Sequence, residues 1–216
     1  MASMESIKDL RERTGAGILD CKKALAENGD NVDRALDWLR AKGIAGAAKR
    51  ASRTAAEGLC EAYIHAGGKI GVLVEINCET DFVAMNENFR GLARDLAMQV
   101  AASAPDYVRR EEVPPEAIER ERAVQLKRVM DEGKPEHIAQ KIVEGRMSKF
   151  YEDVCLLEQK FIKDDSKTID QLVKESVATL GENIQVRRFA RFVMGEGLKK
   201  KEDDFAASVA QAAGVK

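Results

Sequence analysis

Few residues of this chain have side chains suited to nucleophilic attack, proton transfer or metal binding. They are two histidines and four cysteines: His65, His137, Cys21, Cys60, Cys78 and Cys155. The histidines do not have a metal-ligand spacing such as His-x-x-x-His, and no two cysteines form a Cys-x-x-Cys pair. A cysteine–histidine nucleophilic pair stays open, but no neighbouring residue marks a cysteine as activated. We therefore expect reduced, structural cysteines, no metal and no cofactor.

A short glycine-containing segment, Gly15-Ala16-Gly17, is a candidate for phosphate binding. It is not followed by the further glycine, or by the Gly-Lys-Ser/Thr sequence, that phosphate-binding loops need. Two closely spaced glycines also allow a tight turn between helices. We interpret the segment as such a turn.

The segment Asn77–Asn86 has a more specific pattern, because it places polar residues and one aromatic residue between an apolar strand and a helix. Thr80 can cap a helical turn, and Asp81 would then lie near the positive end of the helix dipole. Phe82 is a large aromatic residue in a chain with only 5% aromatic residues. Two interpretations stay open: a helix cap followed by a core phenylalanine, or an exposed tip that inserts into a partner.

Composition limits the classes of partner. The 216 residues carry a formal net charge of −2, so the chain has no overall field that would attract nucleic acid or an anionic membrane. The sequence contains no run of the ~18–20 apolar residues that a membrane span needs. Its amino terminus lacks the basic and apolar pattern of a secretory signal. We expect a cytoplasmic protein that binds neither membrane nor nucleic acid directly.

The amino-terminal part of the chain, residues 1–45, has the pattern of three short helices. Apolar residues recur at helical spacing on each side of Gly15-Ala16-Gly17, and Gly29 separates the second helix from a third that ends near Gly43. Residues 46–57 are rich in alanine, lysine and arginine and contain no large apolar residue. We expect a small three-helix domain followed by a linker, for which a partly helical conformation stays open.

Residues 58–202 have the pattern of an α+β core. The predicted strands are 59–66, 69–78 and 184–194, and Gly67-Gly68 is a two-residue hairpin signal between the first two. Helical stretches fill the sequence between the strands, at 89–102, 116–130, 135–151 and 169–180. We expect a small antiparallel sheet packed with helices, followed by a carboxyl-terminal segment, 203–216.

Two long blocks of the sequence, Leu10–Leu25 and Gly71–Ala84, closely resemble signatures of the translation elongation factor Ts family. They occur in the family's order and separation, and the resemblance continues through Gly181–Ile184 and the arginine-rich strand after it. It therefore covers most of the chain, with a less distinctive match at residues 110–167.

The resemblance implies a ubiquitin-associated-like fold for the three helices and an α+β core for exchange and dimerisation. It implies that the chain binds elongation factor Tu carrying GDP and accelerates GDP release without bond chemistry. The tip would dislodge magnesium, with Phe82 inserted between helices of the partner's GTPase domain and Asp81 making polar contacts beside it. The partner-binding residues implied at the tip are Thr80, Asp81, Phe82 and Val83, and those implied for docking are Arg13, Thr14, Gly15, Ala16, Gly17 and Ile18.

The resemblance also leaves a homodimer open, because short members of the family are thought to pair through their cores. A second class of function is a ubiquitin-associated-like binding scaffold without exchange activity, in which Trp38 and the turn at Ala16–Ile18 would bind and the tip would be structural. A small hydrolase using a cysteine or histidine is a third class. A nucleic-acid binder using Lys49, Arg50 and Arg53 is the weakest alternative.

Overall fold

The computed structural model describes residues 3–133 and 135–198. The predicted carboxyl-terminal segment, 203–216, and the side chain of His137 lie outside the described residues. Among the described helices, none is both long enough and apolar enough to cross a membrane.

Three helices at the amino terminus pack into a unit with its own small core. They are α1 (Met4–Thr14), α2 (Ile18–Glu27) and α3 (Val32–Arg50), and Leu10, Cys21 and Leu25 are fully buried among them. Gly15, at φ 67°, ends α1 in the left-handed conformation that glycine adopts without strain. The Asn31 side chain caps α3 by accepting a hydrogen bond from the Arg34 N–H. The predicted three-helix unit is therefore present.

The third helix is longer than predicted. It continues past Gly43 to Arg50 and so crosses the predicted boundary between residues 1–45 and the linker 46–57. Alanine, lysine and arginine favour helix, and Ala47 is small enough to be buried in the main core although the segment has no large apolar residue. The expected helix end near Gly43 was wrong for this reason, and the division into domains stays a prediction.

The main core contains the predicted small antiparallel sheet, and its three strands lie in the order β1-β2-β5. Its strands are β1 (Glu57–Ile64), β2 (Ile70–Cys78) and β5 (Gln185–Val193). The β1–β2 turn is closed by hydrogen bonds from the Gly68 N–H to the His65 carbonyl and from the His65 N–H to the Ile70 carbonyl. Side chains alternate along β2, so that Val72, Val74, Ile76 and Cys78 are all buried on one face.

Two helices cover that face of the sheet. They are α5 (Glu87–Ser103) and α8 (Ile169–Leu180), and their buried residues join those of β2 in one cluster. The opposite face is exposed and partly apolar, with Ile64 67%, Leu73 47% and Phe192 66% exposed. A two-stranded ribbon, β3 (Lys160–Phe161) and β4 (Asp164–Thr168), precedes α8.

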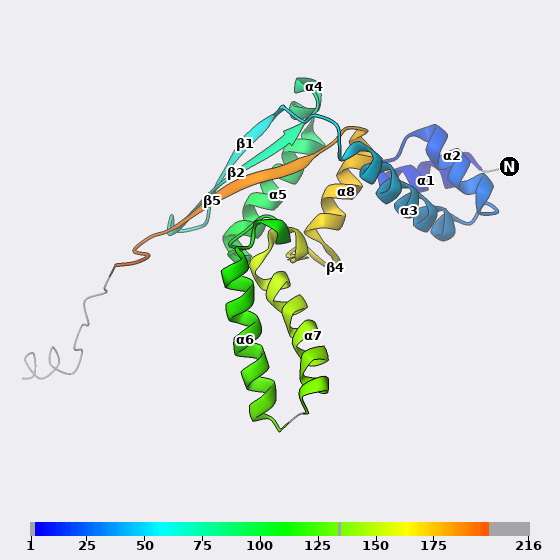
Figure 1. The fold of residues 1–216 in the computed structure, drawn as a ribbon. Coiled ribbons are helices and arrows are strands. Elements are labelled where there is room, and N and C mark those ends of the chain that lie inside the picture. The colour runs from blue at the N-terminus through cyan, green and yellow to red at the C-terminus, as the bar shows by residue number, and fades with distance from the viewer. Residues whose placement is uncertain (1–2, 134, 199–216) are drawn as a thin grey trace, which may run out of the picture.

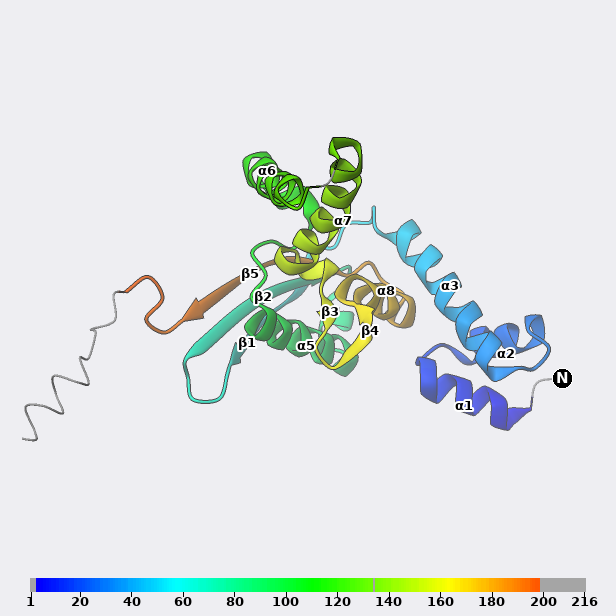
Figure 2. The ribbon, with the colours of Figure 1, turned by 90° about the horizontal axis from the view of Figure 1, so that it is seen from below.

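A helical hairpin projects from the core (Figure 1). It consists of α6 (Pro115–Asp131) and α7 (Glu136–Val154), which bury Val129, Ala139, Val143 and Met147 between them. Two short 3₁₀ turns, η1 (Arg110–Glu112) and η2 (Leu156–Glu158), lie at its base. Figure 2 shows the hairpin and the amino-terminal helices on different sides of the sheet. A third projecting part is α4 (Asp81–Ala84), at the end of β2.

Candidate partner-binding tip

The predicted tip forms a single helical turn, α4 (Asp81–Ala84), between β2 and α5. The Thr80 hydroxyl accepts a hydrogen bond from the Val83 N–H at 3.4 Å, which confirms the predicted helix cap. The Met85 N–H donates to the Asp81 carbonyl at 3.0 Å and closes the turn. Figure 1 shows α4 at the end of the sheet away from the α6–α7 hairpin.

The side chains of α4 fall into two groups. Phe82 is 82% exposed, and Met85, three residues later, is 66% exposed. Val83 is instead half-buried and packs against the main core. The structure therefore contradicts the interpretation of Phe82 as a core residue. Val83, together with Ala84, attaches α4 to the core.

A carboxylate at the foot of the tip holds its backbone. Glu182, just after α8, accepts hydrogen bonds from the N–H groups of Glu79 at 3.1 Å and Thr80 at 3.0 Å. Its second oxygen accepts from the Thr80 hydroxyl at 2.6 Å. Because β2 ends at Cys78, these two backbone N–H groups have left the sheet, and Glu182 supplies the acceptor that the ladder no longer provides.

In a second set of hydrogen bonds, the segment after α8 donates and a side chain next to the tip accepts. The Glu79 carboxylate accepts from the Asn183 N–H at 2.6 Å and lies 3.5 Å from the Arg53 guanidinium. Asn183 is only 2% exposed, and its side-chain amide donates to the Arg53 carbonyl at 2.7 Å. The tip, the start of β5 and the segment after α3 are thereby joined at one point.

The predicted docking residues lie in the turn between α1 and α2, where they have different environments. Ile18 is 54% exposed and Arg13 pairs with Asp33 at 3.1 Å, whereas Ala16 packs against the three-helix core. The Thr14 hydroxyl donates to the Leu10 carbonyl and accepts from the Ala16 N–H, and Gly17 precedes α2 as its cap. Gly15 faces α8, since a Cβ placed there would lie 3.0 Å from the Thr179 methyl group.

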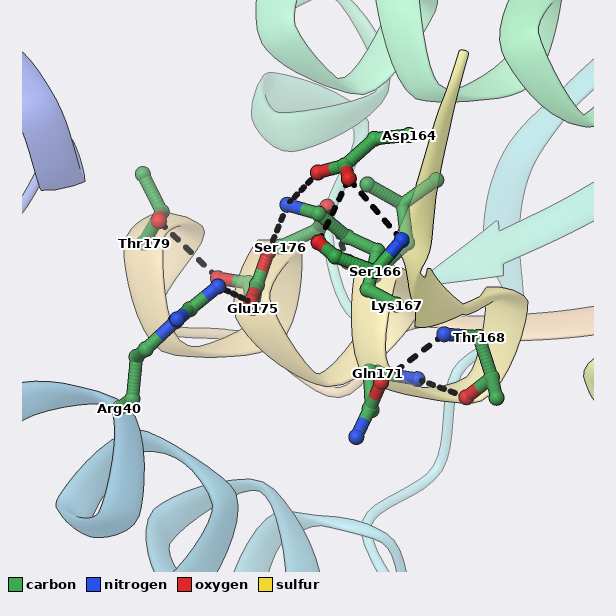
Figure 3. Close-up of polar contacts among 10 residues, drawn as sticks. Arg40, Asp164, Ser166, Lys167, Thr168, Gln171, Glu175, Ser176 and Thr179 are labelled. Atoms are coloured by element: carbon green, nitrogen blue, oxygen red, sulfur yellow. Dashed lines mark hydrogen bonds and ion pairs between the residues drawn. The ribbon is translucent and has the colours of Figure 1, made fainter. Parts of the chain in front are cut away.

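A cleft of about 630 Å³ is lined by this turn and by residues of α3 and α8. One ion pair crosses this cleft, from Arg40 of α3 to Glu175 of α8 at 3.5 Å. Lys167 of β4 lies 3.0 Å from the same carboxylate and 3.5 Å from Asp164 (Figure 3). The predicted docking turn is thus held beside the core, through the contact between α3 and α8.

A structural role was expected for all four cysteines, and the environments of three of the thiols agree with it. Cys21, Cys78 and Cys155 are fully buried, and burial raises the pKa of each thiol, that of Cys155 to about 11. The thiolate is the nucleophilic form, so these residues are poor nucleophiles near neutral pH. Cys60 is exposed on the open face of the sheet. Within the described residues, no cluster of three or more histidine, cysteine, aspartate or glutamate side chains could hold a metal ion.

Some residues of the tip and of the docking turn were not found from sequence. Glu182 and Asn183 fall in a block that carries the family resemblance, but their types alone do not show that they reach a segment about a hundred residues away. Leu19, 82% exposed, and Met85 extend the apolar surface of the turn and of the tip respectively. The signal that could have found these two is their apolar character at positions where the helical spacing faces away from the core.

The comparisons with known proteins agree on one family. The sequence profile of the family described as Elongation factor TS matches residues 46–196. The chain is 61% identical to the Elongation factor Ts of Desulforamulus reducens over 208 residues, which is 96% of each chain. It is 58% and 57% identical to the proteins of that name from Geotalea uraniireducens and Geobacter sulfurreducens, in each case over 97% of both chains. The chain therefore belongs to the elongation factor Ts family and is a translation elongation factor.

Proposed function

We propose that this protein binds elongation factor Tu carrying GDP and accelerates GDP release by inserting the α4 tip. The observation that supports this most directly is the environment of Phe82, a large apolar side chain 82% exposed on a helical turn that is itself fixed at its base. Exposed aromatic residues that fill a partner's pocket dominate many interfaces. The names of the relatives favour elongation factor Tu as the partner.

Exchange of this kind needs binding energy and no bond chemistry. The factor must bind the nucleotide-free partner more tightly than the GDP-bound one, and by linkage GDP then binds less tightly when the factor is present. A GTPase holds GDP through backbone amides around the phosphates and through magnesium. Insertion of Phe82, with the exposed Asp81 carboxylate beside it, would displace the elements that carry these ligands. The protein would act in the cytoplasm, where translation elongation takes place.

The docking turn has a different task in this proposal. Ile18 and Leu19 are exposed apolar residues on a small, separately packed unit, which suits binding to a partner's surface. We infer that this turn, with its neighbours from Arg13 to Gly17, holds the partner while the tip acts. A scaffold without exchange activity would use the same turn and would be insensitive to changes at the tip.

The experiment that tests this function is release of a fluorescent GDP analogue from elongation factor Tu in excess unlabelled GDP. The wild-type protein should accelerate release with increasing concentration, and Phe82→Ala should reduce the acceleration. A buried aromatic anchor contributes about 2 kcal/mol, which corresponds to roughly a thirtyfold slower release.

The matched control is Ile162→Ala, which also removes an exposed apolar side chain but lies between β3 and β4. It should leave acceleration unchanged. If Phe82→Ala accelerates release as well as the wild type does, tip insertion is excluded. If the folded wild type accelerates nothing, the scaffold function is favoured.

We also propose that two copies pair through the open face of the sheet. On this face Ala62, Leu73 and Ala190 lie side by side across the three strands, and Ile64, Gly71 and Phe192 form the next row. These rows form a largely apolar surface on an element whose other face is already buried, as expected of a sheet-to-sheet interface. The tip lies beyond the end of β2, so each copy would keep its tip accessible and the complex would contain two copies of each protein.

A further inference from the structure

Glu182 is the residue that connects the tip most directly to the rest of the fold. Its carboxylate accepts three hydrogen bonds, all from the two residues before α4, at 3.1, 3.0 and 2.6 Å. Hydrogen bonds to a charged acceptor are stronger than those between neutral groups. The three donors lie two or three residues before Phe82, so Glu182 fixes the backbone from which that side chain projects.

The hydroxyl of Thr80 carries this constraint into α4. It donates its proton to Glu182, which leaves a lone pair directed to the Val83 N–H, where it caps the helix. A helix of four residues is too short to be stable alone, because nucleation costs more than one turn of hydrogen bonds returns. The conformation of α4 therefore depends on its cap and on the packing of Val83.

The reciprocal bonds at the same place make the constraint rigid. The Asn183 N–H donates to the Glu79 carboxylate, while the Glu79 N–H donates to the Glu182 carboxylate. Each of the two segments therefore supplies a carboxylate that accepts a hydrogen bond from a backbone N–H of the other. The buried Asn183 amide adds a bond to the carbonyl of Arg53, so three parts of the chain must move together if the tip is to change direction.

We propose that Glu182 is a positioning residue for nucleotide exchange, whose carboxylate holds the cap of α4 so that Phe82 is presented in one preformed direction. This inference rests on the proposed exchange function. An ordered tip loses less conformational entropy when it binds than a mobile one, and a partly ordered tip acts only in the fraction of molecules that have the competent conformation. Glu182 itself need not touch the partner.

Substitutions at Glu182 and at Thr80 test this contact while keeping the shape of each side chain. Glu182→Gln keeps the size of the side chain and one carbonyl acceptor for the two backbone N–H groups, but it removes the charge and reverses the bond to Thr80, whose hydroxyl would accept from the NH₂ group. Thr80→Val keeps the shape of Thr80 and removes the hydroxyl through which Glu182 acts. Thr80→Ser retains the hydroxyl, so α4 should be as well protected from hydrogen exchange in this variant as in the wild type. Glu196→Gln, an exposed glutamate after β5, is the matched control.

The first measurement is hydrogen exchange at the amides of Val83 to Met85 in the free protein, without any partner. Glu182→Gln and Thr80→Val should increase exchange at these amides, whereas amides of β2 and α5 should be protected as in the wild type. Unchanged protection of α4 in both variants would overturn the inference. This measurement does not depend on the exchange function, so it separates failure of the positioning role from failure of that function.

The second measurement is the rate of fluorescent GDP release at increasing factor concentration. The half-saturating concentration should change less than about twofold, because docking through the α1–α2 turn is unaffected. The maximal rate should fall about tenfold, as expected for loss of one strong hydrogen bond. A residue with only a structural role would lower the amount of folded protein and leave the maximal rate of the folded fraction unchanged. That result, with normal protection of α4, would refute the proposal.

Discussion

Phe82 and Val83 are adjacent in the sequence, yet one is exposed and the other packs against the core. The difference follows from the helical turn, which points successive side chains in directions about 100° apart. Val83 can only anchor α4 if Thr80 begins the helix at the correct residue, and Thr80 is held by Glu182. At the scale of single residues, the exposure of one aromatic side chain is thus the result of three neighbouring contacts.

Thiol reactivity is also decided residue by residue. Cys21, Cys78 and Cys155 are buried with raised pKa values, and the pKa of about 11 for Cys155 leaves roughly a thousandth of that thiol ionised at pH 8. We expect iodoacetamide at pH 8 to modify these three residues in urea but not in the native protein, as read by peptide mass spectrometry. Any residual modification of native Cys155 should increase about tenfold per pH unit until its pKa is reached.

The outcome bears on the hydrolase alternative. Rapid native modification of any of the three buried cysteines would indicate an activated thiol and would contradict their structural role. If the protein with alkylated cysteines still accelerates GDP release fully, the modified thiols take no part in that function.

At the scale of elements, most of the fold follows from the sequence pattern. The limits of α8 agree with the prediction residue for residue, because Thr168 and Gly181 are strong local signals at its two ends. The local composition after Gly43 favours helix, but the end of α3 was predicted too early because the packing of Ala47 and Gly43 against distant residues also stabilises the last turns. The tip was predicted as a capped turn. The contact of Glu182 with this turn could not be predicted, because it depends on how β5 and β2 pair in the folded sheet.

The contact between α3 and α8 gives a prediction at this scale. A Cβ at Gly43 would lie 2.9 Å from the Ala178 Cβ, and a Cβ at Gly46 would lie 2.9 Å from the flexible end of Arg50. Gly43→Ala should therefore push the two helices apart and lower the free energy of unfolding by about 1 kcal/mol, the cost of overpacking reduced by the better helix propensity of alanine. Gly46→Ala should be neutral or stabilising by up to about 1 kcal/mol, because the Arg50 side chain can move.

Urea unfolding followed by circular dichroism measures both variants. The double substitution Gly43→Ala with Ala178→Gly should recover packing space at the contact and reduce the loss, a coupling expected of residues that touch. Equal stability of the two single variants would show that α3 does not pack closely on α8 in solution.

At the scale of the whole molecule, the fold separates its surfaces. The tip, the docking turn and the open face of the sheet lie on different elements, so binding at one does not block another (Figures 1 and 2). The open face extends over all three strands of the sheet, and Cys60 lies on it opposite Glu75. Ion pairs from Glu75 of the central strand to Arg187 and Arg188 of β5 limit the apolar area to the part of the sheet nearer the β1–β2 turn.

Pairing through this face can be tested by a charge placed in its apolar part. Phe192→Glu should convert a dimer into a monomer of 23.8 kDa in sedimentation equilibrium, because two copies of the carboxylate would be buried against each other without partners. Dissociation should also make Cys60 react faster with iodoacetamide, since the interface no longer covers it. Ile162→Glu, a charge at an exposed apolar position on a different element, is the control and should leave both properties unchanged. A wild-type protein that sediments as a monomer at all concentrations would refute the pairing, and a dimer that survives Phe192→Glu with Cys60 still reactive would place the interface elsewhere.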